Sequence, residues 1–373
     1  MEQYYLNPQN YEEEMEELLQ QLRVRNILLV CGQSFYQLPV YPFIKSLQKN
    51  KSISITFYND FSLNPRYEEV LQGVKVFEEN MCDFILAVGG GSAIDVAKCI
   101  KLFVGLEKNE DYLCQKIIEN KVPLFAIPTT AGSGSETTQF AVIYIKGNKH
   151  SIEHKSVLPK YVLLYPNNLI TLPIYQKKAT VCDALSHAIE SYWALYSSVK
   201  SRELSETAIC LILDNIAGYL KNDVNSCKNI MLASNFAGQA INITKTTAAH
   251  AMCYKLTSLF GIPHGHAVML CLPEVWEYMQ KKLDVSINDQ KKMYLEKTFN
   301  SLAHCLKQET PKNAIQFLKR LRSKLGLELM EKVDENRLAL LIDSVNVERL
   351  KNSPIILKRE DLRVLYQNVL WRN

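Results

Sequence analysis

The first 165 residues alternate short apolar runs, rich in β-branched side chains, with segments of helical periodicity. Strands that alternate with helices are typical of a parallel sheet with helices on its faces. The expected strands are residues 26–30, 53–58, 84–88, 124–127 and 161–165, and the expected helices are residues 41–49, 66–80 and 93–104. This pattern restricts the fold more than any other feature of the sequence.

The second half of the chain has a different period. From Pro173 onward, apolar residues recur every three or four positions, as in packed amphipathic helices. Residues 181–195, 203–220 and 230–241 show this most clearly. We therefore predict an α/β domain with a parallel sheet over residues 1–168, followed by an all-α domain over residues 169–373. Before the boundary, residues 139–145 and 149–152 predict a hairpin around Gly147-Asn148.

Composition limits the partners of the chain. A net charge of +4 over 373 residues is too small to indicate nucleic acid or a membrane as the main partner. A basic stripe, made of Lys319, Arg320, Arg322 and Lys324, is interpreted as a solvated helix face. The ten cysteines never form CxxC, which indicates reduced, buried thiols. The acidic, polar start is unlike a signal peptide, so we expect a cytoplasmic protein.

A glycine-rich loop follows the expected strand at residues 84–88. Gly89-Gly90-Gly91-Ser92 leads directly into a helix, so its backbone N–H groups can approach a phosphate at the helix N-terminus. Ser92 and Asp95 have the spacing of a capping box. A second loop, residues 127–138, is rich in hydroxyls and glycines and also follows a strand. Two such loops in one sheet favour a nucleotide site, although a plain strand-to-helix turn remains the alternative for either one.

Four residues have the types and spacing of a metal site. Asp183 and His187 are four residues apart in a helical segment, so they lie on one face. His250 and His264 lie among small and apolar neighbours. One carboxylate and three imidazoles suit Fe(II) or Zn(II) better than Mg²⁺ or Ca²⁺. Taken singly, each histidine is more often an ordinary core or surface residue than a metal ligand, and only the four residues together favour a metal site.

The sequences GGGSAIDVAK and PTTAGSGSE, the D-x3-H of DALSHAIE, and H-x13-H ending in PHG occur in this order. In these motifs the chain resembles the iron-containing (group III) alcohol dehydrogenases over nearly its whole length. The resemblance implies a Rossmann-like N-terminal domain, a helical C-terminal domain, and an NAD(P)-dependent oxidation of alcohols or reduction of aldehydes. It implies that Asp183, His187, His250 and His264 bind the metal. The expected cofactor-binding residues in these motifs are Gly89, Gly90, Gly91, Ser92, Asp95, Thr129, Thr130 and Ser133. Lys149, at the family's lysine position ten residues before Pro159, would contact the nicotinamide ribose.

Three positions depart from the family pattern. Many members carry an Asp after the first strand that holds the ribose 2′-hydroxyl, whereas this chain has Gly32, Gln33 and Ser34. Without that carboxylate we expect NADPH as well as NADH to be accepted, with these three residues lining the 2′-phosphate. Tyr254 replaces a second histidine, four residues after His250, and Tyr165, which replaces an Asp, is interpreted as structural.

The candidate catalytic residues are Tyr254 and His266, and the choice between Tyr254, water and a ribose hydroxyl for proton delivery stays open. Residues 139–152 and 241–268 are most similar to the phosphonoacetaldehyde reductase branch, which belongs to phosphonate metabolism and produces 2-hydroxyethylphosphonate. Lys245 and Lys255 would then contact the dianionic substrate, although both could be plain exposed lysines.

Two other functions remain in view: a general small-alcohol dehydrogenase or aldehyde reductase, and a lyase of the dehydroquinate synthase type. The resemblance also implies a homodimer. In every case, we expect a small-molecule substrate and no nucleic-acid partner.

Overall fold

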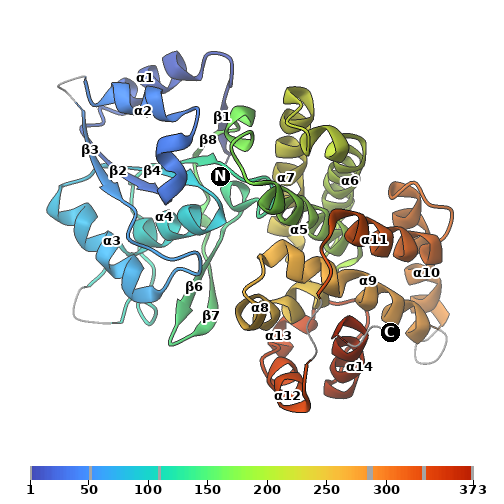
Figure 1. Ribbon diagram of the computed structural model, residues 1–373. Coiled ribbons are helices and arrows are strands. Elements are labelled where there is room, and N and C mark those ends of the chain that lie inside the picture. Colours follow the sequence, from blue (N-terminus) through green and yellow to red (C-terminus); the bar gives the residue numbers. More distant parts are fainter. Residues whose placement is uncertain (1, 50–52, 108–110, 284–288, 330–332, 371–373) are drawn as a thin grey trace. The chain divides into compact units, whose positions relative to one another are not determined.

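The computed structural model describes residues 2–49, 53–107, 111–283, 289–329 and 333–370. The chain divides into two compact units, Met1–Leu172 and Pro173–Asn373 (Figure 1). The first contains a parallel sheet with helices, and the described residues of the second form helices and connecting loops. The fold class expected from the sequence is therefore confirmed.

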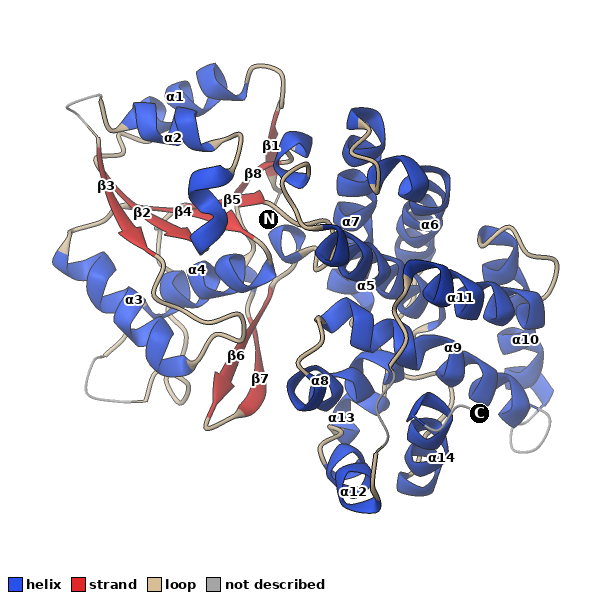
Figure 2. Cartoon of the chain, viewed as in Figure 1, coloured by secondary structure: helices blue, strands red, loops and turns tan. Residues whose placement is uncertain are grey.

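Six parallel strands form the sheet of the first unit, shown in red in Figure 2. Their order across the sheet is β1-β8-β5-β4-β2-β3. They are β1 (Tyr4–Leu6), β2 (Asn26–Cys31), β3 (Ser54–Tyr58), β4 (Phe84–Gly89), β5 (Leu124–Pro128) and β8 (Tyr161–Leu163). Strands β4 and β5 are buried along their whole length, which explains why they read as continuous apolar runs and not as alternating ones.

Two hydrophobic clusters cover the two faces of this sheet. Alternate residues of β2 belong to different clusters: Ile27 and Leu29 to one, Leu28 and Val30 to the other. The first cluster includes residues of α1 (Tyr11–Gln21) and α2 (Tyr41–Leu47). The second includes residues of α3 (Tyr67–Glu79) and α4 (Gly91–Phe103). Figure 1 shows these helix pairs on opposite sides of the strands.

Two details of the first unit differ from the expectation. The sequence analysis missed the short edge strand β1 and the helix α1. The expected hairpin exists as β6 (Phe140–Ile145) and β7 (Asn148–Glu153), but its turn residues are Lys146 and Gly147, because Asn148 already pairs with Ile145. Both turn residues have positive φ, 49° and 78°, as the mirror-image turns of tight hairpins require.

The second unit is built around helix α5 (Ile174–Trp193), in which every residue from Val181 to Trp193 is buried. A helix that is packed on all sides belongs to the interior of its domain. Neighbouring helices are α6 (Val199–Tyr219), α7 (Val224–Thr244), α8 (Ala248–Phe260), α9 (His264–Leu283), α10 (Asp289–Cys305) and α11 (Pro311–Leu325). Three shorter helices end the chain: α12 (Glu335–Asp343), α13 (Val347–Leu350) and α14 (Arg359–Leu370).

The basic stripe on α11 is not uniformly solvated, so that interpretation is wrong in part. Because α11 packs against α9, Arg322 is only 2% exposed and lies 3.7 Å from Glu274 and 3.2 Å from Glu328. Lys319 pairs with Glu274 at 3.0 Å.

All ten cysteines are free, and seven of them are buried. None of the described helices has the length and apolarity needed to cross a membrane.

A buried lysine fastens the loop after β5 to helix α4. Lys98 is fully buried, and its Nζ donates to Ser135 Oγ at 3.0 Å, Thr138 Oγ1 at 3.1 Å and the Phe140 carbonyl at 2.7 Å. The Asp95 carboxylate lies 4.0 Å from the same ammonium group. Burial lowers the pKa of Lys98 to about 8, although Asp95 opposes the shift. The position of this loop therefore depends on a charged group inside the domain.

We expect Lys98→Met to lower the free energy of unfolding by about 3–5 kcal/mol, since it removes one partner of a buried charge pair and leaves the other uncompensated. Urea unfolding followed by circular dichroism measures the change. The matched control is Lys75→Met, which removes an exposed pair with Glu79 and should change stability by no more than about 0.5 kcal/mol. Equal stability of the two variants would show that the Lys98 network is dispensable.

Candidate functional site

Three loops of the first unit meet at the carboxyl ends of the strands. The chain runs from β2 outward to β3 and then returns to β4 on the other side of β2. Such a reversal of strand order is the position at which open α/β sheets bind ligands. The loops after β2, β4 and β5 surround this position.

The glycines allow these loops to touch. A Cβ atom at Gly89 would lie 2.6 Å from the Ala93 Cβ, and one at Gly91 would lie 2.8 Å from Ser133 Oγ. A Cβ at Gly90 would lie 3.2 Å from a methyl group of Thr130. The two loops that the sequence analysis singled out are therefore in direct contact.

Helix α4 begins at Gly91, with Gly90 as its N-cap and no side-chain capping bond. The expected capping box of Ser92 and Asp95 is wrong because the helix starts too early for Ser92 to be the cap. Ser92 Oγ instead donates to the Leu63 carbonyl at 2.5 Å. The first backbone N–H groups of α4 thus lack a side-chain cap, as in an anion-binding helix terminus.

Asp95 is occupied within the protein. Its Oδ1 accepts from Ser135 Oγ at 2.5 Å and its Oδ2 from the Val142 N–H at 3.0 Å. Burial raises the pKa of this carboxyl, against the opposing effect of Lys98, Ser135, Val142 and Lys149. Asp95 therefore holds the hydroxyl-rich loop, residues 127–138, through Ser135.

The remaining expected cofactor residues lie around the same strand ends or on the hairpin. The Thr129 N–H donates to the Gly89 carbonyl at 3.0 Å and continues the pairing of β4 with β5. Gln33 and Ser34 are exposed in a short 3-10 helix directly after Gly32. Lys149 is partly buried on β7.

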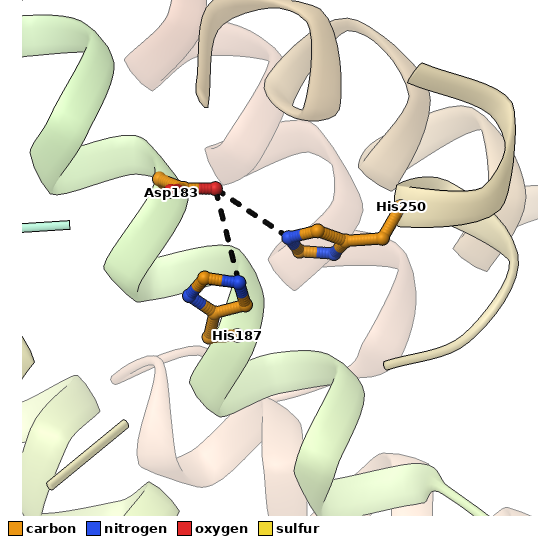
Figure 3. Close-up of side chains that lie close together, drawn as sticks. All are labelled: Asp183, His187 and His250. Carbon is orange, nitrogen blue, oxygen red and sulfur yellow. Dashed lines mark ion pairs between the residues drawn. The ribbon is translucent and has the colours of Figure 1, made fainter. Parts of the chain in front are cut away.

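In the second unit, Asp183 and His187 of α5 lie beside His250 of α8, and their side chains point toward one another (Figure 3). One potential ligand atom from each lies within 4.8 Å of the others, and all three residues are buried. Asp183 Oδ1 is 3.9 Å from His187 Nε2 and 3.4 Å from His250 Nε2. The two imidazole rings stack with centroids 4.4 Å apart.

His264 approaches the same carboxylate oxygen from the start of α9. Its Nε2 lies 3.9 Å from Asp183 Oδ1, and its side chain is 33% exposed. The residue after it explains this approach: a Cβ at Gly265 would lie only 2.0 Å from the Ala179 carbonyl and 2.7 Å from the Asp183 Cβ. Glycine therefore lets α9 begin directly against α5. The structure thus brings together all four residues that the sequence analysis proposed as metal ligands.

The donor set fits a divalent transition metal. Asp183 Oδ1 and His250 Nε2 are buried without a hydrogen-bond partner among the described residues, an arrangement that is costly unless another group compensates it. Burial alone would raise the pKa of Asp183, but the three imidazoles hold it well below its usual range. Burial would lower the pKa of His250, but Glu190 and Asp183 raise it to about 9. One carboxylate with three imidazoles suits Fe(II) or Zn(II).

The two candidate catalytic residues are placed differently. The Tyr254 ring stacks on His264 with centroids 5.6 Å apart, and its hydroxyl accepts a hydrogen bond from Arg349 Nη1. His266 points elsewhere, since its Nδ1 lies 2.8 Å from the Tyr175 hydroxyl. Tyr254 therefore adjoins the cluster, and His266 packs against the first turns of α5.

The two candidate substrate lysines lie at different depths. Lys245 is exposed at the C-terminal end of α7. Lys255 follows His250 by five residues on α8, which turns it to another face of the helix. A cation that adjoins Tyr254 is Arg349 of α13, whose guanidinium lies 5.0 Å from the Tyr254 ring centroid.

Sequence reasoning missed two residues here. Glu190 contacts His250 Nδ1, and its position three residues after His187 on the same helix was a usable signal. Arg349 had no such signal, because it lies 95 residues from Tyr254 and only the fold brings them together.

Two family profiles match the chain: iron-containing alcohol dehydrogenase over residues 3–166, and the C-terminal part of the Fe-containing alcohol dehydrogenase family over residues 177–370. Alcohol dehydrogenase 4 of Schizosaccharomyces pombe is 30% identical over 71% of this chain and 65% of its own length. Probable alcohol dehydrogenase EutG of Escherichia coli is 35% identical over 61% of this chain and 59% of its own length. The match thus spans about three fifths to two thirds of these relatives.

Solved structures resemble the chain over its full length. An iron-containing alcohol dehydrogenase from Thermotoga maritima is 26% identical with a TM-score of 0.83, covering 99% of this chain and 97% of that one. A sulfoacetaldehyde reductase from Bifidobacterium kashiwanohense in complex with NAD+ is 22% identical with a TM-score of 0.85, covering 98% and 96%. The second likeness concerns the fold alone.

Proposed function

This chain belongs to the iron-containing alcohol dehydrogenase family, and from that premise we propose that it is a metal-dependent NAD(P)H oxidoreductase that reduces a small aldehyde to its primary alcohol. The observation that carries the proposal is the convergence of three imidazole Nε2 atoms within 3.4–3.9 Å of Asp183 Oδ1. We assign dinucleotide binding to residues 1–168 and the metal site to residues 169–373.

Asp183, His187, His250 and His264 are the proposed ligands of Fe²⁺, with Zn²⁺ as the alternative. A bound divalent cation would supply Lewis acidity toward a substrate oxygen. The protein itself contributes rigidity, because Asp183 and His187 lie in the part of α5, Val181–Trp193, in which every residue is buried. Ligands held in this way keep their geometry without reorganisation during the reaction.

The N-terminal unit would hold NADPH or NADH by its phosphates. The uncapped N–H groups of α4 and the glycines before it offer donors to a pyrophosphate, and Thr130 and Ser133 add hydroxyls beside them. The nicotinamide would supply the hydride. Asp95 supports this site by positioning the loop that carries Ser133 and Ser135.

Tyr254 is the side chain we propose for proton delivery to the product oxygen. Its hydroxyl accepts from Arg349, so its own hydrogen stays available for donation. It also stacks on the proposed ligand His264, which keeps the phenol next to the cluster. Water and a ribose hydroxyl are the alternative donors.

For the substrate we propose phosphonoacetaldehyde, which would be reduced to 2-hydroxyethylphosphonate. Arg349 supports this choice, because a guanidinium beside the cluster can bind a phosphonate with paired hydrogen bonds. A general small-alcohol dehydrogenase is the nearest alternative, and a lyase of the dehydroquinate synthase type is more remote. Net oxidation of NADPH with an aldehyde distinguishes a reductase from the lyase.

Replacing His264 tests the metal site. We expect His264→Ala to lose tightly bound Fe²⁺ or Zn²⁺ and aldehyde reduction, since one of four ligands is gone, while NADPH binding measured by fluorescence is retained. The control is His304→Ala, which changes an exposed histidine on α10 and should leave metal content unchanged. Full activity of the wild-type protein after metal removal would refute the assignment.

The preference between NADPH and NADH should depend on the residues after β2, where Gly32 stands in place of a carboxylate. We expect the wild-type protein to use NADPH with a kcat/KM at least equal to its kcat/KM for NADH. Gly32→Asp should shift this ratio toward NADH by about 10- to 100-fold, because the carboxylate repels the 2′-phosphate and binds the 2′-hydroxyl. A Cβ at Gly32 has no neighbour within 4 Å, so the variant should fold. A strong NADH preference of the wild type would contradict the prediction.

Arg349 provides the test of the substrate. With Fe²⁺ supplied, we expect Arg349→Gln to reduce the ratio of kcat/KM for phosphonoacetaldehyde over propanal by about 10- to 100-fold, the effect of losing a hydrogen bond between charged groups. Lys351→Gln, an exposed lysine two residues away, is the control. Lys245→Gln and Lys255→Gln examine the two lysines in the same assay. Unchanged ratios in all of these variants would remove the electrostatic argument for an anionic substrate.

A further inference from the structure

Glu190 is a fully buried carboxylate of α5 that reaches across to α8. Its Oε2 contacts His250 Nδ1. Its Oε1 accepts from the Thr247 hydroxyl and from the Ala249 N–H, the latter at 2.9 Å. Thr247 in turn accepts from the Trp193 indole N–H at 3.0 Å. Both carboxylate oxygens therefore have partners, and each partner lies in or next to the first turn of α8.

The direction of these hydrogen bonds fixes the state of His250. An ionised carboxylate only accepts hydrogen bonds, so His250 Nδ1 carries the hydrogen. In the neutral ring, which is the form that binds a metal, the lone pair is then on Nε2. This atom lies 3.4 Å from Asp183 Oδ1 and has no hydrogen-bond partner among the described residues. Histidine ligands of metals are commonly oriented by such a second carboxylate.

Glu190 also holds the start of the helix that carries His250. Thr247 is the N-cap of α8, yet its side chain makes no capping bond to that helix. Glu190 takes over this task from a neighbouring helix by accepting the Ala249 N–H. Since α5 also bears Asp183 and His187, one side chain ties the first turn of α8 to the helix that carries the other two buried members of the cluster.

We infer that Glu190 is a positioning residue for the metal site: it holds His250 in the tautomer with hydrogen on Nδ1 and so directs Nε2 toward the cation. The inference rests on the proposed function, since it presupposes that His250 binds a metal.

Glu190→Gln separates positioning from mere packing because it keeps the shape of the side chain. The Ala249 N–H needs an acceptor, so the amide oxygen should take the place of Oε1. The NH2 group then faces His250 Nδ1 and, as a donor, favours the opposite tautomer, with hydrogen on Nε2. That tautomer cannot bind a metal through Nε2.

The experiment measures metal affinity of the full-length protein by competition with a chromophoric chelator, using Zn²⁺, and records the visible spectrum of the Co²⁺-loaded protein. We expect Glu190→Gln to bind Zn²⁺ about 10- to 100-fold more weakly than wild type, with an altered Co²⁺ spectrum and the same helix content of the metal-free protein by circular dichroism. The control Glu203→Gln, an exposed glutamate paired with Lys200, should match wild type in all three measurements.

Affinity of Glu190→Gln within about threefold of wild type would overturn the inference and leave the metal site itself intact. Failure of the wild-type protein to bind Zn²⁺ or Co²⁺ would instead overturn the proposed function, and the inference with it.

A second measurement on the wild-type protein does not depend on any variant's folding. NMR of the Zn²⁺-loaded protein with ring-¹⁵N histidine, assigned with His250→Gln, should show the His250 hydrogen on Nδ1. A hydrogen on Nε2 would overturn the inference.

Discussion

The packing of the helical unit depends on one buried carboxylate oxygen, Asp183 Oδ1. It has three imidazole nitrogens around it at 3.4–3.9 Å and no hydrogen-bond partner among the described residues. Burying such a group would be unfavourable on its own. Helices α5, α8 and α9 must therefore supply its surroundings together, and the packing between them is a condition for the cluster. The close contact at Gly265 and the reach of Glu190 to α8 are two means by which they do so.

In the N-terminal unit, the proposed site depends on close contact between backbone segments and not on a cluster of side chains. The loops after β4 and β5 touch because Gly91 has no Cβ atom to collide with Ser133, and Gly89 leaves room for Ala93 in the first turn of α4. The buried ammonium of Lys98 and the carboxylate of Asp95 both bond to Ser135 and so hold the hydroxyl-rich loop against α4. The polar groups nearest the proposed phosphate position are thus ordered before any ligand arrives, which reduces the entropic cost of binding.

Sequence periodicity was enough to predict five of the six strands of the sheet and the helical second half. The four residues of the cluster were predicted from their residue types and from the resemblance to the family. Continuous apolar runs marked the buried strands, and the four-residue spacing of Asp183 and His187 placed them on one helical face. What it could not provide were contacts that depend on tertiary packing. Ser92 looked like a helix cap, but the helix began two residues earlier. Arg322 looked solvated, but α11 packs it against Glu274 of α9. The hairpin turn was displaced by one residue because positive φ occurs at Lys146 and Gly147.

The cluster has one side that is fully buried and another that is partly exposed. Asp183 and His187 lie within Val181–Trp193 of α5, where every residue is buried, so a change of side-chain size there disturbs the packing of the core. Tyr254 and Arg349 are only partly buried, and they come from the middle of α8 and from the four-residue helix α13. If the proposed function holds, a change of substrate preference is accommodated more easily at Arg349 than at the buried metal ligands, whose exchange would disturb the core.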